Sequence, residues 1–319
     1  MSHTAIDARA MAPLTQDPRK ADAYRHDPYM REGLRSLAGV RDGETLRRHT
    51  FVVLKPDAVA GRRCALILDV LRSRGWHPVA ATTVRFDPLL VRELWRYQFN
   101  AASPQRIAVV DPLLSSGPAL LVLLEDLDRP DWLPASARLT AAKGSAEPSA
   151  ARSTDLRTLI GRVNGLFNFM HTADEPADVV RELQLFSYQT GWSWCAGPLF
   201  GGADGAAAPA VEVSLASLLV ELEAAIPAHD LDVAASIGRL ALLDGPWGDC
   251  ARTRTDPARI DDWLGVLHDT PLPPGPARWD VLTVLTSWID CNEPGVLPLI
   301  ATGTAEAWRP TKTEEVTSA

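Results

Sequence analysis

The stretch Asn168-Phe169-Met170-His171-Thr172-Ala173-Asp174-Glu175 ends an apolar run in a histidine and leads directly into a helix start. Asp174 is able to cap a helix, and Pro176 suits its first turn. Apolar residues then recur at helical spacing at Val179, Val180, Leu183 and Leu185. This pattern predicts a helix that begins a few residues after His171, with an N-terminus that attracts anions. His171 is therefore either a packing or capping residue or part of a phosphate site.

The sequence before this stretch alternates between strand and helix patterns. The apolar run 50–54 predicts a buried strand that ends at Lys55-Pro56-Asp57, and the run 119–125 predicts a strand at the centre of a sheet. Between them lie an amphipathic helix over 65–71, a strand over 77–86 and a further helix over 88–99. This order predicts an α+β fold, an α/β sandwich of the split βαβ kind with helices on one face of a mostly antiparallel sheet.

Length, charge and cysteine content narrow the class of protein. A chain of 319 residues is long enough for two domains, each with its own core. A net charge of −8 argues against a surface for nucleic acid or an anionic membrane spread over the whole protein. The four cysteines are far apart, so neither a zinc site nor a disulfide framework is expected. With no signal-type apolar core in residues 1–20 and no run of about 18 apolar residues, we expect a cytoplasmic protein without nucleic-acid or membrane partners.

Composition divides the chain into segments. Residues 1–48 are polar and weakly periodic, which predicts an N-terminal arm with at most a short helix around residues 29–37. Residues 201–212 read as a low-complexity linker. Four helical patterns over 213–300 predict a small all-helical domain, whose tryptophans at helical spacing are expected in its core. Residues 301–319 are expected to form a polar tail.

A long basic segment separates the predicted central strand from the histidine stretch. Between residues 130 and 165 periodicity fades, and the segment is rich in arginine, including Arg138, Arg152, Arg157 and Arg162. Long loops in compact domains are usually functional or disordered. Two interpretations stay open: the arginines bind phosphate oxygens in bidentate fashion, or they are solvated charges.

Several of these residues, taken in order, carry a family resemblance. They are Lys55-Pro56-Asp57, Ser116-Gly117-Pro118 before a strand, Arg138, Pro148 and Arg157 in the long loop, Asn168-Phe169-Met170-His171, and Glu182 eleven residues after His171. From about residue 49 to 190 the chain resembles the nucleoside diphosphate kinases. The resemblance implies a ferredoxin-like fold. We therefore expect a domain of this fold over residues 49–200, followed by the small all-helical domain that the apolar spacing predicts. The resemblance also implies a phosphohistidine intermediate in the exchange of a terminal phosphate between nucleotides.

The resemblance implies a role for each matching residue. His171 stands at the position of the nucleophile, and Glu182 at that of the carboxylate that orients it. The remaining matches are sugar contacts (Lys55 and Asn168), a tyrosine beside the histidine (Tyr97), two phosphate-binding arginines (Arg138 and Arg157), a replacement for a phosphate-contacting threonine (Ser145) and a residue that places the metal through water (Asp174).

The chemistry of these side chains agrees with that set of roles. A neutral imidazole nitrogen can attack phosphorus, and an oriented carboxylate fixes the proton on the other ring nitrogen. Positive groups, together with Mg²⁺ bridging the phosphates, stabilise the charge of the transferred group. We therefore expect Mg²⁺ as cofactor and ATP or another nucleoside triphosphate as donor. Because no GxxxxGK motif occurs, a P-loop kinase is not expected.

The sequence departs from the family at several positions near the site. The usual glycine after the Lys-Pro-Asp triplet is Ala58, the segment around Arg157 needs a one-residue shift, and the usual Gly-Ser-Asp-Ser after the histidine is 172–175, Thr-Ala-Asp-Glu. Substrate range and assembly, including a possible homo-oligomer, therefore stay open.

Three functions follow from this pattern. The first is transfer of the terminal phosphate of a nucleoside triphosphate through His171 to a nucleoside diphosphate. The second uses the same phosphohistidine with a non-standard acceptor, such as a modified nucleotide or a small metabolite. The third is nucleotide binding without turnover, coupled to a protein partner.

Overall fold

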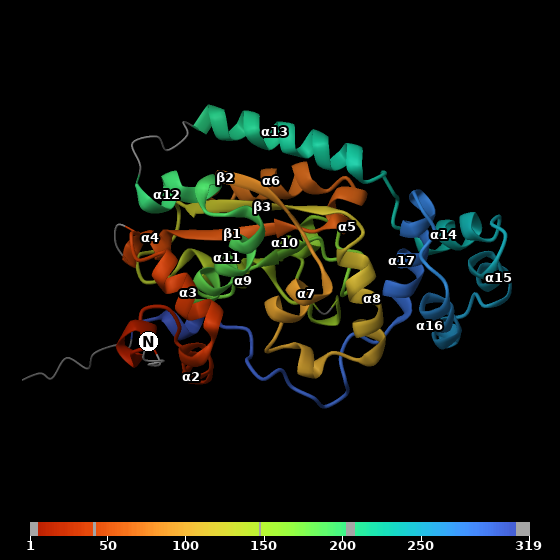
Figure 1. Ribbon diagram of the computed structural model, residues 1–319, viewed down its shortest axis with the longest axis horizontal. Coiled ribbons are helices and arrows are strands. Elements are labelled where there is room, and N and C mark those ends of the chain that lie inside the picture. Colours follow the sequence, from red (N-terminus) through yellow and green to blue (C-terminus); the bar gives the residue numbers. More distant parts are fainter. Residues whose placement is uncertain (1–5, 41–42, 147, 202–207, 311–319) are drawn as a thin grey trace, which may run out of the picture.

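A four-stranded antiparallel sheet forms the centre of the computed structural model, which describes residues 6–40, 43–146, 148–201 and 208–310 (Figure 1). Its strands are β1 (His49–Leu54), β2 (Trp76–Arg85), β3 (Pro118–Asp126) and β4 (Met170–Thr172). They lie in the order β2-β3-β1-β4, and each neighbouring pair is antiparallel. With helices between successive strands, this is the predicted ferredoxin-like, split βαβ arrangement.

Helices cover both faces of the sheet, and the expectation that they cover one face was wrong. Every residue of β1 is buried, and in β3 only Glu125 is partly exposed. Phe51 and Val53 enter one hydrophobic cluster, whereas Val52 and Leu54 enter another on the opposite face. A strand that is apolar on both faces must be covered on both. Figure 1 shows α6 (Cys64–Arg72) and α13 (Ala208–Ala225) above the sheet, and α3 (Pro28–Ser36) and α11 (Pro176–Thr190) below it.

The described part of the N-terminal segment is helical and packed, so the predicted extended arm was wrong there. It contains α1 (Ala8–Met11), α2 (Pro18–His26), α3 and α4 (Gly43–Arg48). Asp17 and Asp27, each followed by proline, cap α2 and α3. At Gly33 of α3, an added Cβ would lie 2.6 Å from the backbone oxygen of Val180, so glycine permits the close approach of α3 to α11.

The remaining α-helices of the first two thirds of the chain lie around the sheet. They are α5 (Pro56–Ala60), α7 (Pro88–Leu94), α8 (Pro104–Leu114), α9 (Ala135–Lys143), α10 (Leu156–Leu159) and α12 (Ala196–Phe200). Helix α9 lies inside the segment expected to be a long loop. Its buried residues include Ala137 and Leu139. Because most of the buried side chains in α9 are small, the sequence shows no clear apolar periodicity there.

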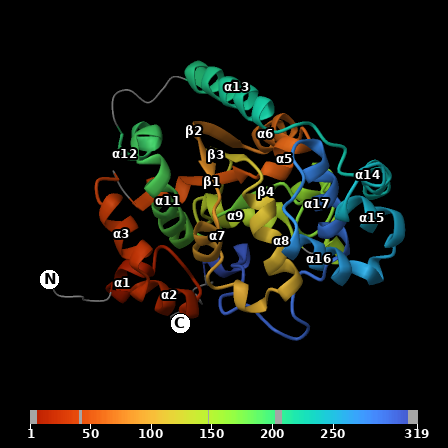
Figure 2. The same cartoon turned by 45° about the vertical axis from the view of Figure 1, so that its right-hand side comes forward.

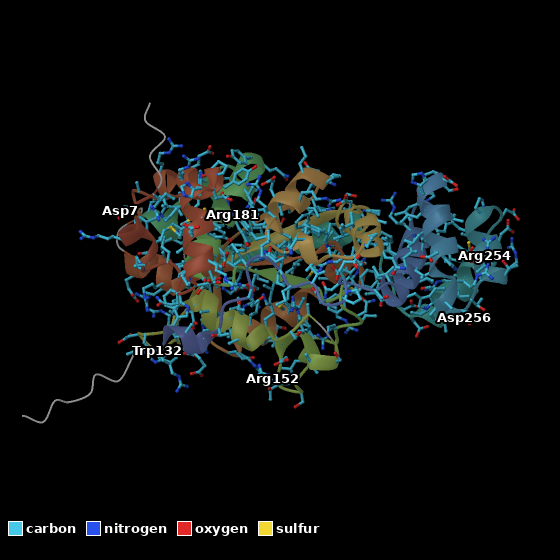
Figure 3. All side chains as sticks on the ribbon, turned by 90° about the horizontal axis from the view of Figure 1, so that it is seen from below. Asp7, Trp132, Arg152, Arg181, Arg254 and Asp256 are labelled. Atoms are coloured by element: carbon cyan, nitrogen blue, oxygen red, sulfur yellow. The ribbon has the colours of Figure 1, made fainter. Side chains whose placement is uncertain are left out.

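The C-terminal helices do not form one bundle. Helix α13 packs on β2 and β3, whereas α14 (Val233–Leu240), α15 (Pro246–Thr253), α16 (Ile260–Asp269) and α17 (Pro276–Trp288) pack on one another. Figure 3 shows this second group projecting from the end of the molecule opposite Asp7. The expected core tryptophans Trp263 and Trp279 are fully buried there, and Trp288 packs edge-on against Trp263. Of the predicted linker, 208–212 belong to α13 and 202–207 lie outside the described residues.

After α17 the chain turns back toward the sheet. Figure 2 shows α17 beside α8, and the segment that follows it passes beneath α8. Ile300 is buried, and Trp308, in the 3₁₀ helix η5 (Ala305–Trp308), packs with Leu133 and Ala137. The expectation of a polar tail was therefore wrong at Trp308, although most residues of 301–310 are exposed. Residues 311–319 lie outside the described residues. The division of the chain into domains stays a proposal.

Candidate functional site

A cavity of about 110 Å³ opens at the end of β1 and β4, between α8 and the loop 163–169. Its polar lining consists of Lys55, Arg106, Arg157, Asn168 and His171. Four of these five were predicted from the sequence. They are Lys55 and, more than one hundred residues later, Arg157, Asn168 and His171. The rest of the wall is mostly apolar, with two aromatic rings. The cavity is therefore a small site in which several cationic groups meet a histidine.

His171 is held by Glu182. The His171 Nε2 lies 2.7 Å from a carboxylate oxygen of Glu182, and both side chains are nearly buried. Strand β4, paired with β1 at Val53, fixes the backbone of His171, and α11 carries Glu182 back to it eleven residues later. Because Nε2 donates to the carboxylate, the neutral imidazole has its unprotonated nitrogen at Nδ1. Burial raises the pKa of Glu182, and the neighbouring His171 opposes that rise.

Trp95, not Tyr97, is the aromatic residue beside the histidine. The rings of Trp95 and His171 are 5.1 Å apart and nearly perpendicular. Tyr97 points away, and its hydroxyl donates to Asp27 over 3.1 Å. The prediction for Tyr97 was therefore wrong in position. The helix predicted over 88–99 ends at Leu94, and Trp95 and Tyr97 lie in the turn that follows it. The sequence gave no signal to choose between these two aromatic residues.

Lys55 is fixed where β1 ends. Its ammonium donates to the Leu166 carbonyl over 2.7 Å and lies 3.5 Å from a carboxylate oxygen of Asp57. The same oxygen accepts the backbone N–H of Phe169, which has a positive φ of 70°. Burial lowers the pKa of Lys55 and raises that of Asp57. The Lys-Pro-Asp triplet thus ties the strand end to the loop that carries Asn168.

Arg157 and Asn168 keep unused hydrogen-bonding capacity at the cavity. Arg157 is 7% exposed and donates to the Gly144 carbonyl over 2.9 Å, and its buried Nε has no partner in the described part of the chain. Burial lowers the pKa of Arg157 to about 10. The Asn168 amide donates to the Gly165 carbonyl over 2.6 Å, and no donor among the described residues reaches its buried oxygen. Unsatisfied buried groups are costly and call for a ligand or water.

Arg138 and Ser145 were predicted to bind phosphate, but neither lines this cavity. Arg138 donates to Asp126 over 2.7 Å, and its guanidinium lies 4.1 Å above the Trp76 ring. Ser145 is adjacent to the cavity-lining Ala146, and its carbonyl accepts from Arg162. The expected placement of Arg138 at the phosphate site was therefore wrong, whereas the contact expected of Ser145 stays a prediction. The Arg138 position satisfies a buried carboxylate, which a cavity-facing rotamer would leave unpaired.

Asp174 was expected to help place a metal, but it is engaged elsewhere. One carboxylate oxygen accepts from Thr140 over 3.0 Å and lies 3.3 Å from the Lys143 ammonium. Burial would raise the pKa of Asp174, but Lys143, Lys20 and His171 hold it below its usual value. The described lining of the cavity offers no carboxylate, and in the same described part no three metal-binding side chains cluster. The residues therefore do not fit a protein-held Mg²⁺; an ion arriving with a nucleotide is bound mainly by phosphate and water.

The N-terminus of α11 is not open to a phosphate. Glu175 caps the helix, and Asp178 accepts the Glu175 backbone N–H over 2.9 Å in a reciprocal capping box. Lys20 lies 2.9 Å from Glu175 and 2.7 Å from Asp178. Protein carboxylates therefore occupy the anion site that the sequence pattern suggested.

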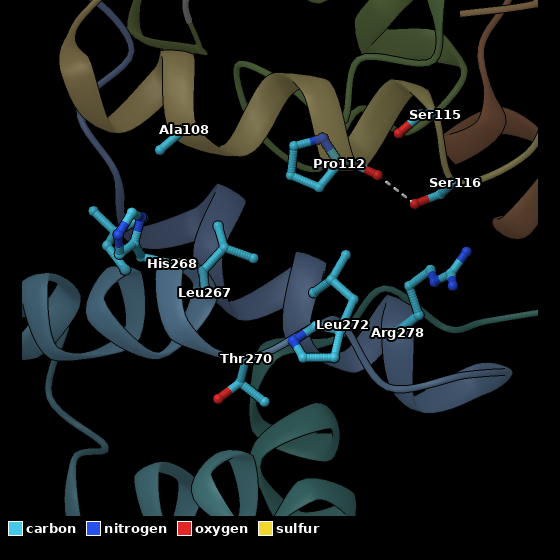
Figure 4. Close-up of a pocket in the computed structure, with 11 residues that line it drawn as sticks. Ala108, Pro112, Ser115, Ser116, Leu267, His268, Thr270, Leu272 and Arg278 are labelled. Carbon is cyan, nitrogen blue, oxygen red and sulfur yellow. Dashed lines mark hydrogen bonds between the residues drawn. The ribbon is translucent and has the colours of Figure 1, made fainter. Parts of the chain in front are cut away.

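Arg106 is the site residue that sequence reasoning missed. It lies on α8 with Val110, Leu113 and Leu114, which line the same cavity at helical spacing. A larger cavity of about 580 Å³ lies on another face of α8, between Ala108 and Pro112 and the loop around Leu272 (Figure 4). None of the predicted catalytic or nucleotide-binding residues lines this larger cavity. The smaller cavity is therefore the candidate site.

Comparisons with known proteins point to one family. Residues 48–190 match the sequence model of the family described as Nucleoside diphosphate kinase. A nucleoside diphosphate kinase of Methanothermobacter thermautotrophicus is 28% identical over 137 residues, which cover 43% of this chain and 85% of the relative. Among solved structures, the enzyme of Aquifex aeolicus is 25% identical, covering 43% of this chain and 93% of its own, with a TM-score of 0.36. The apo enzyme of Encephalitozoon cuniculi is 20% identical, covering 47% and 90%, with a TM-score of 0.37.

The sheet and the candidate site both lie within the matched region or at its edge. The match over residues 48–190 supports a nucleoside-diphosphate-kinase-family region there, as the resemblance predicted. The family match supports nucleotide binding and kinase-type transfer of phosphate. The N-terminal helices and everything after residue 190 lie outside it. Within the described residues, no helix is long and apolar enough to cross a membrane.

Proposed function

We propose that the protein transfers the terminal phosphate of a nucleoside triphosphate through His171 to a nucleoside diphosphate. The observation that carries this proposal is the 2.7 Å contact between His171 Nε2 and Glu182, which leaves Nδ1 for attack. Lys55 and Arg157 lie in the same cavity, where their charges would stabilise phosphate oxygens. A histidine without an oriented nitrogen or without neighbouring cations would not support this chemistry.

The reaction consists of two displacements at phosphorus. The Nδ1 lone pair attacks the γ-phosphorus, the new N–P bond forms, and the bond from the γ-phosphorus to the bridging oxygen breaks, which releases a nucleoside diphosphate. The terminal oxygen of a second diphosphate then attacks the phosphohistidine, and the N–P bond breaks. Glu182 accepts the Nε2 proton in a hydrogen bond throughout and stabilises the positive charge that develops on the ring. Covalent storage on His171 allows both nucleotides to use one site in turn.

The phosphate site gives a reason to retain a non-standard acceptor as the second candidate. Arg138 is paired with Asp126, so one of the two expected phosphate-binding arginines is engaged elsewhere. Ala146, which has no hydroxyl, lines the cavity next to Ser145. An acceptor with a different distribution of charge would suit such a site. Nucleotide binding without turnover is the third candidate.

Labelling with γ-labelled ATP and Mg²⁺ separates these candidates. We expect an acid-labile, alkali-stable phosphoenzyme that nucleoside diphosphates discharge. His171→Ala should abolish the label, whereas His77→Ala, at an exposed histidine on β2, should retain it. A label that diphosphates do not remove would favour the non-standard acceptor. Absence of label in the wild-type protein, or label that survives His171→Ala, would end the catalytic proposal.

A further inference from the structure

The candidate cavity has an excess of positive charge. Lys55, Arg106 and Arg157 line it, and none of the described lining residues is acidic. Asp57 pairs with Lys55 from behind at 3.5 Å, and Glu182 is bonded to His171. Burying like charges together is unfavourable unless an anion compensates them. The cavity is therefore built for a strongly anionic ligand.

Arg106 is the least satisfied of these cations. Its Nη1 donates a hydrogen bond to the amide oxygen of Asn292 over 3.1 Å, and its buried Nε has no partner among the described residues. Its guanidinium lies 5.8 Å from the centre of the Phe99 ring. Burial lowers the pKa of Arg106, and its charge contributes to the lowered pKa of Lys55. A guanidinium fixed by one neutral amide keeps donors for a bidentate anion.

The segment after α17 holds Arg106 and the wall around it. Asn292 forms an isolated antiparallel bridge with Ala102, and the Glu293 N–H donates to the Ala101 carbonyl over 2.9 Å. The Ser103 N–H donates to the Cys291 carbonyl, just before α8 begins. The start of the helix that carries Arg106 is thus attached to the C-terminal region.

The opposite wall is attached to the same region. The Asn164 amide donates to the hydroxyls of Thr286 and Ser287 at 3.1 and 3.2 Å, near the end of α17. At Gly165, an added Cβ would lie 3.1 Å from the Cys291 sulfur. Both walls of the cavity are therefore positioned by residues 286–293, which lie outside the family match.

We propose that Arg106 binds the phosphate groups of the nucleotide and that Asn292, from the C-terminal region, is its positioning residue. This inference rests on the proposed function, because it takes the nucleotide as the ligand. It gives the C-terminal region a role in substrate recognition. Arg106 thus provides a positive charge at the site, where the predicted Arg138 is instead paired with Asp126.

Equilibrium binding to the His171→Ala protein tests this role without phosphoryl transfer. Inorganic tripolyphosphate and uncharged adenosine serve as separate probes. We expect Arg106→Gln to weaken tripolyphosphate binding by about tenfold or more, because charge-assisted hydrogen bonds are lost, and to leave adenosine binding unchanged. Arg106→Lys, which keeps the charge but loses the planar fork, should give an intermediate loss. Arg92→Gln is the matched control, because Arg92 also lies near Phe99 but is bonded to Asp111.

A double-mutant cycle tests Asn292. Asn292→Ala should weaken tripolyphosphate binding when Arg106 is present and have no further effect in Arg106→Gln, whereas a general structural role would give additive losses. Unchanged tripolyphosphate affinity in Arg106→Gln, or equal losses for adenosine, would overturn the assignment. Tripolyphosphate binding that depends on Arg106 in a protein that forms no phosphoenzyme would refute the catalytic proposal alone.

Discussion

Asp27 and Arg181 form an ion pair, with 2.9 Å between Arg181 Nε and an Asp27 carboxylate oxygen, and both side chains are almost completely buried. Asp27 also caps α3 through the backbone N–H groups of Tyr29 and Met30. Arg181 precedes Glu182 on α11. The ion pair therefore attaches the N-terminal helices to the helix whose Glu182 orients His171. Figure 3 shows Arg181 next to these N-terminal helices.

Removal of Asp27 should destabilise the protein strongly. Asp27→Ala leaves the Arg181 guanidinium buried without its carboxylate and removes the cap of α3, so we expect a loss of about 3 to 5 kcal/mol in the free energy of unfolding. Chemical denaturation followed by far-UV circular dichroism measures it. Asp22→Ala on α2 is the control, because Asp22 is exposed. Equal stability of the two variants would mean that the N-terminal helices are not anchored by this pair.

The buried ammonium of Lys20 should give stability that depends on alkaline pH. Burial opposes its charge, but Asp178 and Glu175 more than compensate, so the pKa of Lys20 is raised. A raised lysine pKa contributes stability that is complete below the unfolded-state value of about 10.4 and is lost as pH rises toward the folded value. The gap in unfolding free energy between wild type and Lys20→Met should therefore be constant from pH 7 to about 10 and shrink above that. Denaturation curves across this range test it; a gap that grows with alkaline pH would contradict it.

Glu182→Gln should slow formation of the phosphoenzyme while leaving nucleotide affinity intact. Glutamine can still accept the Nε2 proton, but it carries no charge to stabilise the ring as the N–P bond forms. We expect a decrease of about 10² to 10⁴ in the labelling rate, in the range of other oriented acid-base partners. Rapid-quench labelling measures it, with Glu212→Gln on α13 as control, where Glu212 pairs with Arg72 at the surface. A labelling rate equal to that of wild type would remove Glu182 from the mechanism.

The sheet could be predicted from the sequence because its strands carry their signal locally. The runs 51–54 and 119–124 are apolar at every position, which is typical of strands covered on both faces. The N-terminal helices could not be predicted in this way. Asp-Pro pairs, which begin α2 and α3 here, occur both at helix starts and in irregular segments. Helix α13 was predicted as a helix, but its placement on β2 and β3 depends on contacts that no local pattern encodes.

The site was predictable where strands and helices fix a residue, and less so where a long side chain chooses its partner. His171 and Glu182 are positioned by β4 and α11, so their spacing in sequence was informative. The sequence does not show whether Arg138 faces the cavity or a protein carboxylate. In the structure it pairs with the buried carboxylate of Asp126. Arg106 gains its significance from Asn292, nearly two hundred residues later, and such a pairing has no local signature.

Arg138 and Arg157 should therefore behave oppositely when each is replaced by glutamine. Arg138→Gln removes the partner of the buried Asp126 and the contact with the Trp76 ring, so we expect a loss of about 1 to 3 kcal/mol in unfolding free energy. Its tripolyphosphate affinity should stay at the wild-type value. Arg157→Gln should weaken tripolyphosphate binding by about tenfold or more, because a cavity-lining guanidinium is lost.

Calorimetric binding and denaturation curves on both variants decide between the two placements. Each variant serves as the control for the other, since both remove one guanidinium from the same segment of the chain. If Arg138→Gln weakened tripolyphosphate binding as much as Arg157→Gln, Arg138 would have to leave Asp126 when phosphate binds. The pairing with Asp126 would then be a resting arrangement, and the free energy needed to break it would reduce the affinity of the site for phosphate.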